Sequence, residues 1–77
     1  MQFSEKLTEL RRRRGLSQEQ LADFLGVTRQ SVSKWESGSV MPELGKLIAL
    51  SDLFHVTVDA LVKDRLDLPD PDQAGHM

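Results

Sequence analysis

The chain has 77 residues, no cysteine, and a formal net charge of −2 from 10 basic and 12 acidic side chains. Its length suits one small domain. The lack of cysteine excludes a disulfide framework and a thiolate zinc site, and favours a reducing compartment such as the cytoplasm. No apolar run approaches the roughly 18 residues of a membrane span, and residues 1–6 lack the pattern of a signal peptide. The net charge alone disfavours nucleic acid as a partner.

Turn and capping signals divide residues 1–65 into five short helical segments, and we predict an all-α domain over this range. No stretch alternates apolar and polar residues as a strand does. The first helix is predicted over residues 3–13, with Gly15 ending it. Its apolar face holds Phe3, Leu7 and Leu10, and its other side holds Glu5, Lys6, Glu9 and Arg13.

The second and third helices follow closely on one another. Ser17 and Gln20 have the spacing of a capping box, which starts the second helix, and Gly26 closes it. Thr28 is the next N-cap, and the third helix is predicted over residues 29–36. The residues expected to be buried in these two helices are Leu21, Ala22, Leu25, Val32 and Trp35.

The fourth helix is predicted to hold Pro42 among its early residues and to run to about Phe54. Its expected apolar face consists of Leu44, Leu47, Ile48 and Phe54. Thr57 caps a short fifth helix with Val58, Leu61 and Val62 as its apolar residues. Residues 66–77 contain two prolines and three aspartates, so we expect a flexible acidic tail or linker beyond the domain.

Only Gly26 and Val27 connect the second helix to the N-cap of the third, and so tight a connection makes two helices cross steeply. Ala22 is small where the helices pass, and Val27 can fill the gap between them. The exposed face of the third helix has no carboxylate before Glu36. It carries Thr28, Arg29, Gln30, Ser31, Ser33 and Lys34. Donors and short polar groups of this kind suit the major groove of DNA, where the base edges can be read.

The run from Ser17 to Gly38, SQEQLADFLGVTRQSVSKWESG, resembles the helix-turn-helix of the phage repressor and Cro family, which includes many bacterial regulators. The likeness extends over residues 3–62, through Leu10-Arg11, Gly15-Leu16, Pro42 and the run LFHVTVDAL at 53–61. It departs at His55, where the family often has a glycine ending the fourth helix, and this puts the local helix cap in doubt.

The resemblance implies a lambda repressor-like domain, a compact bundle of five helices that binds double-stranded operator DNA, as a dimer on a two-fold site. The expected protein is a transcriptional regulator, specifically a repressor, in the cytoplasm of a bacterium or encoded by a phage, and associated with the nucleoid. No metal, cofactor or membrane is expected, and no catalytic set of residues points to an enzyme. A homodimer is possible through the fifth helix and Leu66 or Leu68, although these residues could equally complete the monomer core.

The same resemblance implies a role for each residue of the site. Gln18 would contact a phosphate, although it could also be a solvated first-turn residue. Arg29, Gln30 and Ser33 are expected to contact bases, with a phosphate contact as the alternative for Arg29. The other expected DNA contacts are Thr28, Ser31, Lys34, and the backbone N–H groups of Ser37, Gly38 and Ser39. Arg11 and Glu36 are implied to form a structural ion pair between the first and third helices.

The alternative to DNA binding is a protein-interaction module that keeps the fold, and the surface of the third helix discriminates between the two. An interaction module should show acidic or apolar residues there, whereas this helix shows basic and amide side chains. Residues 11–34 hold six basic and two acidic side chains, whereas residues 47–77 hold two basic and six acidic ones. The net charge of −2 therefore combines a basic segment with an acidic distal half.

Overall fold

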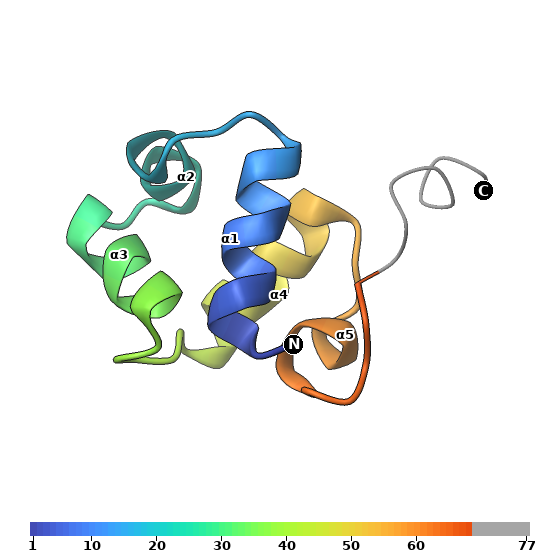
Figure 1. Cartoon of the computed structure of the whole chain (residues 1–77). Helices are drawn as coiled ribbons and strands as arrows, with labels where there is room; N and C mark the ends of the chain where they lie inside the picture. The colour runs from blue at the N-terminus through green and yellow to red at the C-terminus, as the bar shows by residue number, and fades with distance from the viewer. Residues whose placement is uncertain (69–77) are drawn as a thin grey trace.

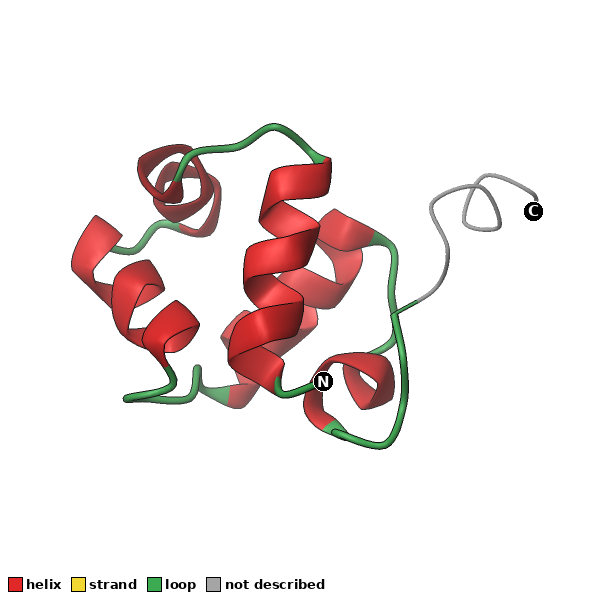
Figure 2. Ribbon diagram, in the orientation of Figure 1, coloured by secondary structure: helices red, strands yellow, loops and turns green. Residues whose placement is uncertain are grey.

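The computed structural model describes residues 1–68. Within this range the chain forms five helices: α1 (Phe3–Arg13), α2 (Gln18–Leu25), α3 (Arg29–Ser37), α4 (Leu44–Phe54) and α5 (Val58–Val62). Figures 1 and 2 show α2 and α3 on one side of α1, with α5 close to the N-terminus. The predicted all-α, five-helix fold is confirmed. Of the expected tail at 66–77, residues 69–77 lie outside the described part of the chain.

Short polar side chains and left-handed residues set the helix ends. The hydroxyls of Ser17, Thr28 and Thr57 accept hydrogen bonds from the backbone N–H groups three residues on, so the three predicted N-caps are confirmed. His55, at the C-cap of α4, adopts φ 56° and ψ 43°. This left-handed conformation is the one that glycine usually supplies. The fourth helix therefore ends where the family pattern predicts, with a histidine in place of the expected glycine.

The start and the buried face of α4 differ from the prediction. Pro42 is buried but lies before the helix, which takes Glu43 as its N-cap. Leu44 and Ile48, expected in the core, are 66% and 46% exposed. The buried side of α4 instead carries Leu50 and Phe54, which lie on the same face as the partly buried Leu47. Apolar residues surround this helix on several sides, so their spacing did not define a single inward face.

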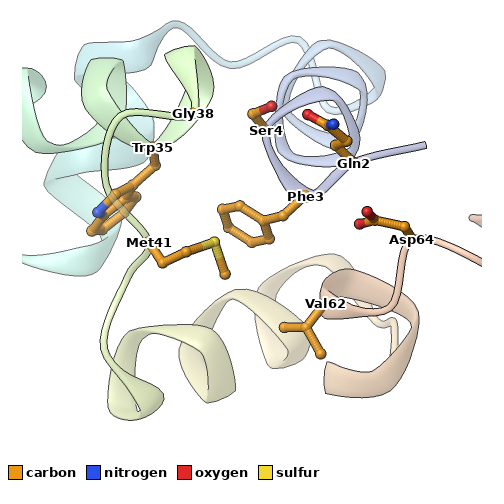
Figure 3. A pocket seen from close by; sticks show the side chains of 8 residues that line it. All are labelled: Gln2, Phe3, Ser4, Trp35, Gly38, Met41, Val62 and Asp64. Carbon is orange, nitrogen blue, oxygen red and sulfur yellow. The ribbon is translucent and has the colours of Figure 1, made fainter.

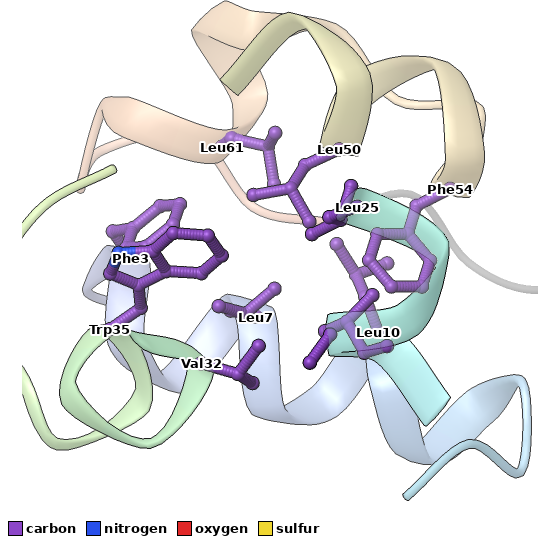
Figure 4. Close-up of a cluster of buried hydrophobic side chains, with 11 residues drawn as sticks. Phe3, Leu7, Leu10, Leu25, Val32, Trp35, Leu50, Phe54 and Leu61 are labelled. Carbon is purple, nitrogen blue, oxygen red and sulfur yellow. The ribbon is translucent and has the colours of Figure 1, made fainter. Parts of the chain in front are cut away.

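One continuous apolar cluster joins all five helices (Figure 4). Its fully or nearly fully buried members are Phe3, Leu7, Leu10, Leu21, Ala22, Leu25, Val32, Trp35, Leu50, Phe54 and Leu61. The expectation that Trp35 packs in the core is confirmed, with 6% of it exposed. Val62 and Leu68 pack against the cluster from the C-terminal side. No helix within residues 1–68 has the length and apolar character needed to cross a bilayer.

Lys6 was predicted on the solvent side of α1, and this was wrong, because the residue is completely buried. Its ammonium donates to the carbonyl oxygens of Ala60 and Lys63, each at 2.6 Å. Carbonyls at the C-terminal end of a helix have no partner within the helix, and the helix dipole there attracts a cation. Lys6 therefore satisfies the end of α5 and ties it to α1.

Candidate nucleic-acid interface

The connection between α2 and α3 is as tight as its sequence indicates. Gly26 adopts φ 68°, and the N–H of Val27 donates to the Ala22 carbonyl at 3.0 Å, which closes α2 and redirects the chain. Ala22 is 2% exposed, and Val27 packs partly buried against the core. The two helices pack against one another, and α3 lies at the outer edge of the bundle in Figure 1. One side of α3 thus remains open to a partner.

The two sides of α3 have opposite character. Val32 and Trp35 are buried. The outward side chains of Arg29, Gln30, Ser33 and Lys34 are all exposed. Among residues 1–68, these four side chains make no hydrogen bond or ion pair, so their donors and acceptors are available to a partner. The outward row combines two cations, an amide and a hydroxyl, and contains no carboxylate.

Hydroxyl groups flank this row at both ends of α3. At the N-terminal end, the Oγ1 of Thr28 lies 3.1 Å from the Oγ of half-buried Ser31, so each hydroxyl orients the other. At the C-terminal end, the Ser37 hydroxyl donates to the carbonyl of Lys34 at 3.0 Å and lies 2.9 Å from the Oγ of Ser39. These hydroxyls are therefore held in place rather than free to rotate.

The backbone N–H groups of Ser37, Gly38 and Ser39, which the sequence predicts to meet phosphate, have acceptors within the protein. Ser37 belongs to α3, so its N–H lies within the helical hydrogen-bond pattern. The N–H of Gly38 donates to the Trp35 carbonyl at 3.3 Å, and that of Ser39 to the Lys34 carbonyl at 3.0 Å. These bonds complete the C-terminal cap of α3. Only the side-chain hydroxyls of this turn remain to meet a phosphate.

The Glu36 carboxylate connects α1, α2 and α3. It accepts hydrogen bonds from Nε of Arg11 at 2.7 Å, from Nη2 of Arg11 at 3.1 Å and from Nε2 of Gln18 at 3.2 Å. The remaining Arg11 nitrogen, Nη1, donates to the carbonyl of Leu16 at 2.8 Å and fixes the turn between α1 and α2. The two charged side chains are only 14% and 7% exposed. The structure thus pairs Arg11 with Glu36 and adds Gln18 to the pair.

The ionisation of this pair follows from its surroundings. Burial alone would raise the pKa of Glu36, but hydrogen bonds from Arg11 and Gln18, with the charge of Arg11, outweigh burial and lower that pKa below its usual 4.5. The hydrogen bond to Glu36 raises the pKa of Arg11, against the opposing effect of burial. Both groups are therefore charged throughout the neutral range.

Three of the six basic side chains in residues 11–34, Arg11, Arg13 and Arg14, bond to other groups of the protein. Arg14 donates to the Leu53 carbonyl at 2.7 Å, beside the end of α4, and Arg13 pairs with Glu9 at 3.2 Å. Lys46 donates to the Leu25 carbonyl at 3.0 Å, at the end of α2. Arg14 and Lys46, like Lys6 and Arg11, link one helix or turn to another, whereas the pair of Arg13 with Glu9 lies within α1. The positive charge of residues 11–34 is therefore larger than the positive charge that α3 itself presents to a partner.

Sequence reasoning did not identify Lys6, Thr8 or Lys46 as partners of specific groups. For Lys6 a signal was present, because Phe3, Lys6, Leu7 and Leu10 have the spacing of a single helical face. For Thr8 and Lys46 no such signal exists in the sequence. The Thr8 hydroxyl donates to the Ser4 carbonyl within α1 and lines one recess with Glu36 of α3, and the bond from Lys46 to the Leu25 carbonyl joins α4 to α2.

A tightly joined helix pair with a polar outer helix on an apolar bundle defines a helix-turn-helix protein. The model of the family described as Helix-turn-helix matches residues 7–61, and the chain belongs to this family. It is 48% identical over 62 residues to the HTH-type transcriptional activator BcrR of Enterococcus faecalis, covering 80% of this chain and 30% of BcrR. It is 44% identical over 61 residues to the SPbeta prophage-derived regulator YonR of Bacillus subtilis (strain 168), covering 79% of this chain and 56% of YonR.

Among solved structures, the chain resembles the P22 c2 repressor in a crystal with a synthetic operator, with a TM-score of 0.78 and 27% identity. The match covers 82% of this chain and 96% of that one. The chain spans less than two thirds of BcrR and of YonR. These relatives are transcriptional regulators by name, in agreement with the prediction that the chain is not an enzyme.

Proposed function

We propose that this chain binds double-stranded DNA in a sequence-specific manner as a transcriptional regulator, with α3 in the major groove. The observation that carries the proposal is the unpaired outward row of Arg29, Gln30, Ser33 and Lys34 on α3. Arginine can bind guanine through two hydrogen bonds, and glutamine can bind adenine in the same way. A protein-interaction surface would need apolar or acidic side chains at these positions.

In this proposal, base readout falls to Arg29, Gln30 and Ser33, and the surrounding groups position the protein on the backbone. Lys34 and the hydroxyls of Thr28, Ser31, Ser37 and Ser39 lie around the row and suit contacts to phosphate. Gly38 forms the turn at the end of α3 that would bring the Ser37 and Ser39 hydroxyls and its own backbone to the phosphates.

In this proposal Gln18 binds a phosphate in addition to its hydrogen bond with Glu36. One hydrogen of its Nε2 is used by Glu36, which leaves the other hydrogen and the backbone N–H at the start of α2. The first N–H groups of a helix lack partners within the helix and attract anions. Gln18 would thus place one phosphate at a fixed distance from α3, with Glu36 holding its side chain in position.

The proposal also covers whether the protein represses or activates transcription and where in the cell it acts. Binding to an operator that overlaps a promoter would exclude the polymerase, and we propose that the protein acts in this way as a repressor. Its place would be the cytoplasm of a bacterium, at the nucleoid. The P22 c2 repressor, solved with an operator, supports this direction, whereas BcrR is named an activator. A reporter gene behind the selected operator distinguishes repression from activation by the sign of its response.

Selection from a random pool of DNA duplexes tests the proposal. The expected result is one enriched sequence, bound in a mobility-shift assay and lost in the double variant Arg29→Ala/Lys34→Ala. The matched control is Lys63→Ala/Arg65→Ala, which removes the same charge from the α5 end of the molecule, where both side chains are exposed. No enriched sequence, or equal weakening by both double variants, would contradict sequence-specific binding by α3.

A further inference from the structure

A recess of about 210 Å³ lies where the start of α1, the end of α3 and the segment after α5 meet. Phe3, Trp35, Met41 and Val62 form its apolar wall, and Asp64 lies at its edge (Figure 3). We call it the Trp35 recess. None of the four side chains in the outward row of α3 lines it. The Trp35 recess is therefore separate from the proposed DNA interface.

The apolar wall is closed on the side of the core and open at the surface. Phe3 and Trp35 are each only 6% exposed and form the floor of the recess, whereas Met41 is 53% exposed. Figure 3 shows Met41 reaching toward both rings. A methionine side chain is flexible and polarizable, and it adapts to the shape of an apolar group placed against it. The wall therefore suits a ring or a branched chain.

Asp64 brings a negative charge to the Trp35 recess. Its side chain is exposed, and Figure 3 shows the carboxylate directed toward Phe3. Among residues 1–68 this carboxylate makes no hydrogen bond or ion pair. Two ammonium groups lie close by, but that of Met1 donates to the Asp64 carbonyl at 3.2 Å and that of Lys6 donates to carbonyls at the end of α5. Neither residue lines the recess, so the carboxylate is available to a ligand.

The size of the recess limits what it can hold. Pockets that bind drug-sized ligands measure about 300–1,000 Å³, so this one suits a smaller molecule with a single ring or one branched chain. In sites with apolar walls, a few polar groups fix the orientation of the ligand. The Asp64 carboxylate is an acceptor with a negative charge, and the group that matches it is an ammonium.

We propose that the Trp35 recess binds a small organic cation, whose ammonium meets the Asp64 carboxylate and whose apolar body packs against Phe3, Trp35 and Met41. A neutral molecule of the same shape would keep the apolar contacts and lose the charge-assisted hydrogen bond. An anion of that shape would be repelled by the carboxylate. The proposal does not depend on DNA binding by α3, since no residue of the outward row takes part in it.

A ligand in this recess would contact α1 and α3 at once. Gly38, the C-cap of α3, lies beside Ser4 of α1, because a Cβ at Gly38 would be 3.7 Å from the Ser4 hydroxyl oxygen. Both residues line the recess. A ligand that binds the folded chain and not the unfolded one stabilises the fold. Binding should therefore raise the melting temperature of the protein.

Tryptophan fluorescence of the full chain with a free N-terminus tests the site without DNA. Trp35 is the only tryptophan and the chain has no tyrosine, so the emission comes from the wall of this recess. Phenethylamine is the probe, and phenethyl alcohol, which carries a hydroxyl in place of the ammonium, is its control. We expect a saturable change of emission with a millimolar Kd for the amine, because the molecule has few atoms. The Kd of the alcohol should be about fivefold higher, since Asp64 is exposed and its ion pair is weakened by solvent.

Asp64→Asn separates the charge from the apolar contacts. It should raise the Kd of phenethylamine about fivefold and leave that of phenethyl alcohol unchanged. Asp67→Asn is the matched control, because it removes the same charge from an exposed side chain that does not line the recess. This control should keep the Kd of the wild type for both probes. Met41→Ala should weaken both probes, because it removes part of the apolar wall that they share.

The melting temperature provides a second measurement. At one fixed concentration, phenethylamine should raise it more for the wild type and for Asp67→Asn than for Asp64→Asn. An emission that changes without saturation, equal Kd values for amine and alcohol, or equal effects of Asp64→Asn and Asp67→Asn would overturn the proposal. DNA is absent from every measurement, so a failure of sequence-specific DNA binding would leave these results unaffected.

Discussion

The guanidinium of Arg11 holds the carboxylate of Glu36 through two hydrogen bonds, of 2.7 and 3.1 Å, between the first and third helices. The same carboxylate receives Gln18 at 3.2 Å from the second helix. Three helices that share few other polar contacts thus meet at one buried charge. The orientation of α3, and with it the outward row of side chains, depends on this point.

A double-mutant cycle measures what the pair contributes to stability. Glu36→Ala should lower the free energy of unfolding by about 3 kcal/mol, because it leaves the poorly exposed Arg11 without its partner. Arg11→Met should have a similar effect, and the double variant Arg11→Met/Glu36→Leu should recover much of the loss. Urea denaturation of the four proteins provides the values. Additive losses would show that the two side chains act independently.

The lowered pKa of Glu36 makes part of the stability depend on pH. A carboxyl group with a lower pKa in the folded state stabilises above its unfolded pKa, and this contribution is lost as pH falls through the folded pKa. We expect the contribution of Glu36 to be complete above its usual pKa of 4.5 and to disappear in more acidic solution. Melting temperatures of the wild type and Glu36→Gln should therefore differ most near neutral pH and converge in acid. A constant difference would rule out the linkage.

Much of the fold could be predicted from the sequence, because its signals are local. Ser17, Thr28 and Thr57 mark helix starts through short-range hydrogen bonds that need no tertiary context. Lys6 and Ile48 could not be placed correctly in this way. Burial of Lys6 depends on carbonyls at residues 60 and 63, far along the chain, and exposure of Ile48 depends on which side of α4 meets α2 and α5.

Replacement of Lys6 tests whether its ammonium stabilises the end of α5. Lys6→Met keeps the length and apolar stem of the side chain but leaves the Ala60 carbonyl without a donor, whereas the Lys63 carbonyl keeps its bond from the Leu66 N–H. The cost of a buried polar group without a partner is about 1–3 kcal/mol, and we expect a loss of stability in this range. Lys63→Met is the control, because the side chain of Lys63 is exposed and makes only a surface pair with Asp59. Equal losses in both variants would argue against a specific role of Lys6.

In the candidate site, too, some features could be predicted from neighbouring residues, whereas others depend on contacts between distant parts of the chain. The exposed side of α3 followed from the positions of Val32 and Trp35 alone. The spacing of residues could not reveal that Arg14 caps α4 or that the N–H groups of Gly38 and Ser39 are used by the end of α3. Those bonds depend on the folded arrangement, and they reduce the number of groups left for DNA.

The salt dependence of DNA binding should reflect the small number of cationic side chains that α3 offers to phosphates. Each phosphate neutralised contributes about −0.9 to the slope of log K against log salt concentration. Lys34→Ala should reduce the magnitude of the slope by about one for each phosphate that the variant no longer neutralises, and should weaken binding to all sequences alike. Arg14→Ala should leave the slope unchanged, since Arg14 bonds to the Leu53 carbonyl. If Arg14→Ala changed the slope and Lys34→Ala did not, the DNA interface would lie on α1 rather than on α3.

Base readout by α3 is the central claim, and the binding of Gln30→Ala to the selected operator and its single-base variants tests it most directly. We expect this variant to lose about 1–3 kcal/mol of binding free energy and its preference at one base pair only. Gln20→Ala, which removes the same side chain from α2, should keep the full preference. Unchanged affinity and base preference in Gln30→Ala would contradict recognition of DNA by the outward face of α3.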